Sequence, residues 1–346
     1  MDIMALLFSF CGGAFAAVIG SLAAFIICGA MALLGVISAM AGVDFNWFGL
    51  IPFGIFFGPH ISFAGGAAAA AFAKKKGFLG SGKDIARALI SLKKPSVIIA
   101  GGIYGMLGYL INYGLSTVMA GKIDTVAFTI VIIGLITKFL YDADYKLSGL
   151  FGSVPDGVKK AGGRYSIRSN GNWFPYLHTP AEKTVVALAA GGASAYVSYV
   201  MLQNPATAPV AAYVGFAVAV ISLIFLQFGT AIPVTHHMCL VASYATVASG
   251  SLWWGVAFGI IAAFLADFLA KTFYVYGDCH VDCPSMGIAS GSFLALGVMP
   301  LTGLYQLDGT ALPIGVTVLF ILYSYIQYRR YGSEAGTSLP QSEIAA

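Results

Sequence analysis

The sequence predicts an all-α polytopic membrane protein with about eleven transmembrane helices. The chain has 346 residues, of which 59% are hydrophobic and only 9% are charged. Soluble domains carry roughly 25% charged residues, so this chain cannot cover a surface that faces water. Long, continuous apolar stretches recur along the whole chain, as is typical of helices that cross a bilayer. The composition excludes a soluble enzyme and a nucleic-acid-binding protein, and the net charge of +4 is too small to indicate an acidic partner.

Eleven apolar stretches account for the predicted transmembrane helices. In chain order they cover residues 4–24, 26–42, 50–73, 96–118, 124–141, 184–203, 208–228, 230–250, 252–274, 286–305 and 310–328. The first two stretches are almost contiguous, and the internal repeat described below favours two spans over one long tilted helix.

Basic residues indicate which side of the membrane each loop faces, because lysine and arginine favour the cytoplasmic side. They gather in the loops 74–95 and 142–183 and at Arg329 and Arg330. With eleven spans all of these fall on one side, and the other side carries only Lys122. The sequence therefore predicts a multi-pass cell membrane protein with its N-terminus outside and its C-terminus in the cytoplasm. Within the first loop, apolar residues at helical spacing predict a short amphipathic helix in the membrane interface.

Weak self-similarity between the two halves of the chain predicts an internal repeat. Four matches recur in the same order: Gly12-Gly13-Ala14 with Gly191-Gly192-Ala193, His60 with His236, Ser96 with Ser251, and Asn112 with Asp267. Five spans per half is an odd number, so the second half would be inverted, as in many secondary transporters. The alternative is chance similarity between helices rich in glycine and alanine. The predicted units are a first repeat at 1–142 with a cytoplasmic insert at 74–95, a connecting loop at 143–183, a second repeat at 184–305, and an extra helix with a cytoplasmic tail at 306–346.

Prolines predict that the third and the eighth spans are broken. Pro59 follows a glycine in the third, and Pro233 lies inside the eighth. The two half-helices would present free N–H groups and titratable side chains near the middle of the membrane, where such residues usually serve a function. The candidate substrate-binding residues are His60, His236, His237, Ser62 and Thr235. The alternative is that the histidines only satisfy the broken backbone.

Asp267 is the deepest acidic residue in the predicted spans. Lys271 follows one helical turn later and could pair with it, and Asn112 occupies the equivalent place in the first half. We expect these three residues to form a proton-coupling site, with a structural ion pair as the alternative. A second pair, Lys138 and Asp142, lies at the predicted cytoplasmic boundary, where solvated side chains are expected.

A polar cluster separates the ninth and the tenth spans. It contains Cys279, His280, Asp282 and Cys283. Thiolate and imidazole ligands suit zinc or copper(I), so the cluster is a candidate metal site. The alternative is a tight polar turn that ends one helix and starts the next at Pro284. A disulfide is not expected on the cytoplasmic side.

Together these features favour a secondary transporter for a small solute, and if transport is proton-coupled we expect Asp267 to carry the proton. No Walker A motif is present, which disfavours ATP-driven transport by this chain alone. The alternatives are a passive channel built on the same half-helices and, less favoured, an intramembrane metal-dependent enzyme. The half-helices favour an anion or a carbonyl-bearing solute, and the cysteine cluster favours a soft metal ion. The predicted partners are the lipid bilayer and a small molecule or ion, and a homo-oligomer is compatible with the sequence.

Overall fold

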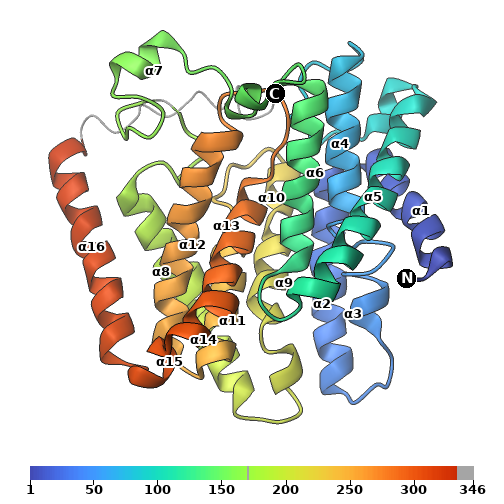
Figure 1. Cartoon of the computed structure of the whole chain (residues 1–346). Coiled ribbons are helices and arrows are strands. Elements are labelled where there is room, and N and C mark those ends of the chain that lie inside the picture. The colour runs from blue at the N-terminus through green and yellow to red at the C-terminus, as the bar shows by residue number, and fades with distance from the viewer. Residues whose placement is uncertain (170, 333–346) are drawn as a thin grey trace.

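The computed structural model describes residues 1–169 and 171–332, and this part of the chain forms a bundle of helices without a β-strand (Figure 1). Within it, six helices are long and apolar enough to cross a membrane. They are α2 (Ser21–Met40), α5 (Pro95–Met119), α8 (Pro180–Leu202), α12 (Leu252–Phe273), the stretch Cys283–Thr302 that begins with α13 (Cys283–Ser292), and α16 (Ala311–Tyr331). The structure is therefore compatible with the predicted helical membrane protein.

Shorter helices complete the described part of the bundle. The apolar ones are α1 (Ile3–Ile19), α6 (Thr125–Tyr141), α9 (Tyr213–Ser222) and α10 (Ile224–Gln227). Short helical turns in the connecting segments are η2 (Leu147–Phe151), α7 (Asp156–Lys160), η3 (Ala208–Val210) and α15 (Leu304–Leu307). Each of the eleven predicted stretches contains helix, and the number of membrane crossings stays a prediction.

The two predicted breaks coincide with non-helical segments. In the third stretch a single turn, α3 (Trp47–Leu50), is followed by irregular backbone until α4 (Ser62–Lys75) begins. In the eighth stretch the backbone from Gly229 to Thr235 is irregular, and α11 (His236–Ser249) begins directly afterwards. Proline cannot donate a helical hydrogen bond and clashes with the preceding turn, which explains both interruptions.

The helix that begins with α13 is also irregular, although the apolar stretch 286–305 predicts one continuous span. A π-helical turn, η4 (Phe293–Val298), separates α13 from α14 (Met299–Thr302). Pro300 lies in the first turn of α14 and has no N–H to donate, so the regular helical hydrogen bonds cannot run through this point.

Within each half of the described chain, three helices pack closely on one another. In the first half these are α1, α4 and α5, and in the second half they are α8, α11 and α12. The first group meets through glycines, because a Cβ atom at Gly13 would overlap the backbone of α5 at Gly101 and Gly105. In the second group Gly191 of α8 faces Gly259 of α12 in the same way. Both groups therefore depend on backbones that approach without side chains between them.

The two halves meet through a second set of contacts. α2 packs on α9, and α6 packs on α13. α16 lies outside these contacts, at one side of the bundle against α8 and α12 (Figure 1). The largest cluster of buried apolar side chains, which includes Phe25, Phe63, Phe216 and Leu240, draws on both halves.

The predicted amphipathic helix in the insert 74–95 is not formed. Beyond α4 the insert consists of turns and one 3₁₀ turn, η1 (Leu89–Leu92), and it is held against the segment after α12. Asp278 accepts hydrogen bonds from the Ser81 hydroxyl at 2.6 Å and the Gly82 N–H at 3.0 Å, and it pairs with Lys74 at 3.2 Å. These tertiary bonds and the glycines of the insert override its helical spacing of apolar residues.

Candidate functional site

A cavity of about 360 Å³ lies between the two halves of the described chain. Its volume falls at the lower end of the range of small-molecule sites, roughly 300–1,000 Å³. The first half contributes Phe25, Phe48, Gly49, Phe53, Pro59, Ile123, Asp124, Thr125, Val126, Ala127 and Ile130, and the second half contributes Tyr213, Phe216, His236, Leu240, Tyr244, Ser285 and Ile288. The cavity therefore borders both broken segments, through Pro59 on one side and His236 on the other.

Aromatic rings form a continuous wall along this cavity. Phe48 lies 5.1 Å from Tyr213, measured between ring centroids, and Tyr213 lies 5.4 Å from Phe53. The wall continues from Phe53 to Phe216 at 6.0 Å and from Phe216 to Phe25 at 6.1 Å. All four of these ring pairs are tilted or edge-on, so the ring planes along the cavity are not parallel to one another.

Asp124 supplies the only carboxylate among the lining residues. It caps the N-terminus of α6, where its Oδ1 accepts a hydrogen bond of 2.8 Å from the Ala127 N–H. Its Oδ2 accepts a second bond of 2.8 Å from the Tyr244 hydroxyl, which comes from the other half of the chain. No lysine or arginine lines the cavity, and no ion pair to Asp124 is found among the described residues. The charge of this carboxylate is therefore not balanced by a neighbouring cation.

His236 is the one predicted substrate-binding residue that lines this cavity. It is the first residue of α11, its ring lies edge-on to Phe25 at 5.0 Å, and its buried Nδ1 has no hydrogen-bond partner among the described residues. Thr235 occupies the N-cap position as predicted, but its side chain makes no capping hydrogen bond. The start of α11 therefore leaves both an unpaired ring nitrogen and uncapped N–H groups.

The remaining predicted residues at the breaks point elsewhere. The ring of His237 lies 5.9 Å from Trp173, and both of its nitrogens are buried without a hydrogen-bond partner in the described part of the chain. His60 is buried in the turn before α4, and its Nδ1 is likewise unpartnered. The Ser62 hydroxyl donates to the Gly58 carbonyl at 3.2 Å, which satisfies the broken backbone. The structure thus brings one of the five candidates to the cavity.

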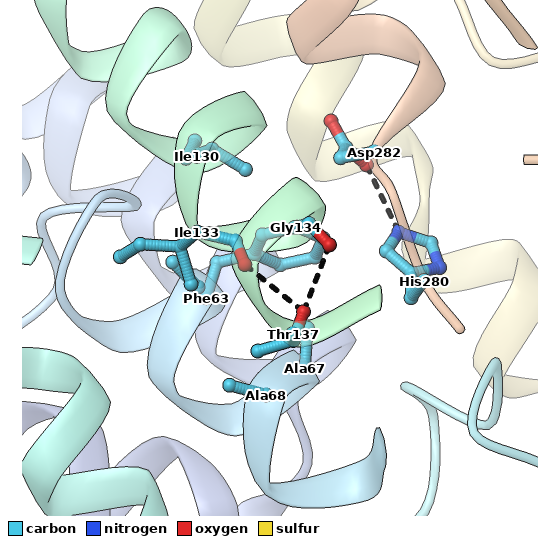
Figure 2. A pocket seen from close by; sticks show the side chains of 10 residues that line it. Phe63, Ala67, Ala68, Ile130, Ile133, Gly134, Thr137, His280 and Asp282 are labelled. Atoms are coloured by element: carbon cyan, nitrogen blue, oxygen red, sulfur yellow. Dashed lines mark hydrogen bonds and ion pairs between the residues drawn. The ribbon is translucent and has the colours of Figure 1, made fainter. Parts of the chain in front are cut away.

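The predicted metal cluster folds as a buried turn. His280 and Asp282 border a small void next to α4 and α6, where His280 Nε2 lies 3.1 Å from Asp282 Oδ1 (Figure 2). Asp282 also caps α13 by accepting from the Ser285 N–H at 2.8 Å. Cys279 contacts the Thr137 hydroxyl at 3.5 Å, and Cys283 contacts a backbone carbonyl.

Ligation by this turn would require deprotonated thiols. Burial raises the pKa of the Cys279 thiol to about 12, so it stays protonated at neutral pH. All five cysteines are free thiols. Over the described residues, no group of three or more His, Cys, Asp and Glu side chains is arranged to hold a metal ion.

A buried charge cluster forms around Asp267. Its Oδ2 lies 3.0 Å from Lys271 Nζ, as the predicted pairing requires, and 2.5 Å from Lys183 Nζ. Asp267, Lys183 and Lys271 are only 6%, 3% and 2% exposed, and Asp267 Oδ1 has no hydrogen-bond partner within residues 1–169 and 171–332. Two ammonium groups thus share one carboxylate. Asn112, the predicted counterpart in the first half, lies on α5, and no described residue makes a hydrogen bond to its buried Oδ1.

Lys183 was not among the predicted site residues, because it ends the segment 142–183, whose basic residues indicate a cytoplasmic loop. Thr179 and Glu182 form a capping box at the start of α8, so the helix begins at Pro180 and Lys183 lies within its first turns. The signal was the spacing Thr-x-x-Glu, which marks a helix start ahead of this lysine.

The expectation that Lys138 and Asp142 are solvated was also wrong for the lysine. Lys138 is fully buried, donates to the Phe273 carbonyl at 2.7 Å and pairs with Asp142 at 3.5 Å. The segment after α12 covers this end of α6, because a side chain at Gly277 would overlap the lysine.

Comparison with known families gives one match. DUF7973, described as a family of unknown function, matches residues 1–157 and again residues 151–312. The chain belongs to this family. No curated protein and no solved structure matches the chain. The two DUF7973 matches meet at residues 151–157, within the segment that links α6 to α8.

Proposed function

We propose that the protein is a secondary transporter for a small solute, with its substrate site in the cavity between the two halves. The observation that carries this proposal is the cavity itself, which both halves line and which borders both broken segments. Transporters built from inverted repeats bind their substrates at the interface of the repeats, next to discontinuous helices.

The pattern of helix contacts supports a five-plus-five inverted repeat. If α1, α2, α4, α5 and α6 correspond in order to α8, α9, α11, α12 and α13, then each contact group has its counterpart. The group α1, α4 and α5 matches the group α8, α11 and α12. The contacts between halves, α2 with α9 and α6 with α13, each join an element to its own counterpart. A pseudo-twofold axis between the halves would give this pattern, and two matches of one family to consecutive segments are consistent with it.

We further propose that the ten helices of the two repeats and α16 make eleven spans. The N-terminus would then lie outside, and the basic loops and the C-terminus would lie in the cytoplasm. The lysines and arginines of the loops support this orientation.

For proton coupling we propose the cluster of Asp267, Lys183 and Lys271. Because two ammonium groups share one carboxylate, the cluster carries a surplus positive charge, and release of one proton would leave it neutral. Asn112 cannot titrate, so coupling would reside in the second half only.

Counterflow in proteoliposomes tests the transporter against the passive channel. The purified chain is reconstituted, and uptake is measured for a panel of small organic cations, carboxylates and neutral solutes, with and without a pH gradient. A carrier gives saturable uptake that accelerates when the same solute is preloaded inside. A channel gives flux that neither saturates in the millimolar range nor responds to preloading, and that result would refute the proposal.

A matched pair of variants links transport to the cavity. Leu240 lines the cavity, so Leu240→Trp should fill it and abolish uptake. Leu301 is 88% exposed, so Leu301→Trp adds the same ring outside the cavity and should leave uptake unchanged. Thermal unfolding of both variants shows whether loss of uptake reflects loss of the fold.

A further inference from the structure

We infer that the cavity binds a small organic ammonium ion, held by the Asp124 carboxylate and by the surrounding aromatic rings. This inference rests on the proposed function in that it names the substrate class of the same site. It rests on the charge, the lining and the size of the cavity.

The charge of the cavity favours a cation. Asp124 is its only formally charged lining residue apart from the titratable His236, and no lysine or arginine lies beside it. The Asp124 carboxylate accepts from the Ala127 N–H, the Tyr244 hydroxyl and the Val126 N–H at the N-terminus of α6. These donors and the helix N-terminus stabilise the ionised carboxylate and oppose the cost of its burial. A carboxylate has about four lone-pair sites, so three donors leave capacity for a ligand.

The helix start at His236, on the other side of the cavity, does not change the preference of the cavity for a cation. The uncapped start of α11 at His236 is the positive end of a helix dipole. Asp282 lies within electrostatic range of His236 and caps the neighbouring helix α13 at Ser285, which also lines the cavity. The acidic residue near this end offsets the partial positive charge of the helix start.

The aromatic wall favours an organic cation over a metal ion. Phe25, Phe48, Phe53, Tyr213 and Phe216 all line the cavity next to Asp124. Aromatic faces attract ammonium groups through their quadrupoles, most strongly when the cation is desolvated, and they replace the hydration of alkylammonium groups well. Metal ions such as sodium or calcium require several oxygen ligands, and Asp124 is the single carboxylate here. A volume of about 360 Å³ suits a small molecule and exceeds the needs of a bare ion.

Equilibrium binding to the purified full chain in lipid nanodiscs tests the inference. The probes are tetramethylammonium, choline and ethanolamine, with 3,3-dimethylbutan-1-ol as the neutral analogue of choline and acetate as an anion. Isothermal titration calorimetry at constant ionic strength measures each affinity. We expect at least one ammonium probe to bind, choline to bind at least about tenfold more tightly than its neutral analogue, and acetate not to bind.

Matched variants assign the effect to Asp124. Asp124→Asn retains a residue that caps helices well but removes the charge, and it should weaken ammonium binding at least about tenfold while leaving the neutral analogue unchanged. Asp44→Asn makes the same change at an exposed residue that does not line the cavity, and it should have no effect. Phe53→Leu should weaken choline more than its neutral analogue, because it keeps an apolar side chain and removes the ring.

Three results would each overturn the inference. The first is that no ammonium probe binds at 10 mM, a concentration about ten times a Kd of 1 mM. The others are equal affinities for choline and its neutral analogue, and unchanged ammonium binding in Asp124→Asn. These results are independent of the transport assay. Ammonium binding without counterflow would retain the cation site and refute the transporter. Counterflow of another solute without ammonium binding would retain the transporter and refute the cation site.

Discussion

Replacing Asp267 with asparagine should destabilise the protein far more than replacing one of its lysine partners. Asp267→Asn leaves two buried ammonium groups, Lys183 and Lys271, facing each other without a carboxylate. Removing one partner of a buried ion pair costs about 3–5 kcal/mol, because a charge stays buried and uncompensated. Lys183→Met instead removes the 2.5 Å contact with Asp267 and a hydrogen bond of 3.3 Å to the His178 carbonyl, but it takes away the surplus buried charge and leaves the neutral pair of Asp267 and Lys271. We expect that variant to lose only about 1 kcal/mol.

The measurement is the free energy of unfolding from titration with a denaturing detergent, followed by intrinsic fluorescence. The double variant, Asp267→Asn with Lys183→Met, retains one unpaired ammonium group and should lie between the two single variants. Equal losses for Asp267→Asn and Lys183→Met, or a loss below about 1 kcal/mol for Asp267→Asn, would show that the cluster is solvated and that its surplus charge has no consequence. Because Asp267→Asn threatens the fold, Lys183→Met is the better variant for testing proton coupling in transport.

Three further predictions follow from the packing, the buried histidine outside the helices and the orientation. Gly13→Leu should prevent correct packing of α1 on α5 and reduce the yield of folded, monodisperse protein in size-exclusion chromatography, whereas Gly114→Leu, where a side chain meets open space, should not. Burial and then the charge of Lys271 lower the pKa of His178 from its ordinary value of 6.5, so the folded state binds this proton less readily than the unfolded state. The free energy of unfolding should therefore keep the full contribution of neutral His178 above pH 6.5, and below it should fall by up to about 1.4 kcal/mol per pH unit. His178→Gln should make this fall shallower, and an unchanged slope would contradict the reasoning. In a Cys11→Ser background, a membrane-impermeant maleimide added to intact cells should label Lys122→Cys and spare Lys160→Cys, and the reverse pattern would overturn the proposed orientation.

Hydropathy and proline positions predicted the helices and their interruptions closely. Continuous apolar stretches can satisfy their backbone in a membrane only as helices, so the location of each stretch carries direct structural information. Pro59 and Pro233 likewise act locally, and the structure places irregular backbone at both. The location of His236 at the start of α11 followed from the same local rule.

The lining of the cavity could not be predicted in this way, because it depends on which sides of distant helices meet. Phe25, Phe48 and Tyr213 lie in three separate apolar stretches, where an aromatic residue is equally suited to face lipid. Asp124 is the first residue of a predicted span, and a helix cap explains it without any cavity. Its partner Tyr244 lies 120 residues away in sequence, so only the folded chain brings them together.

The same limit applies to charged side chains near the ends of helices. Counting lysines assigns a loop to one side of the membrane, but it does not reveal that Lys183 and Lys138 fold inward. The insert 74–95 shows the converse, because its apolar spacing predicted a helix, whereas it folds as turns that are bonded to Asp278.

Those bonds between the insert and Asp278 have a mechanical consequence for any motion of the two halves. The insert belongs to the first half and Asp278 to the second, and the Lys83 ammonium adds a bond of 3.2 Å to the Val275 carbonyl. These bonds form a latch, in which the insert 74–95 ties the first half to the second at the end of the bundle that carries the insert. The cavity lies between the halves elsewhere in the bundle. A rocking motion would pivot about this latch, and opening at the basic end would require the latch to release first. The strength of three hydrogen bonds and one ion pair between the insert and the segment after α12 would then set how often the cavity opens towards that side.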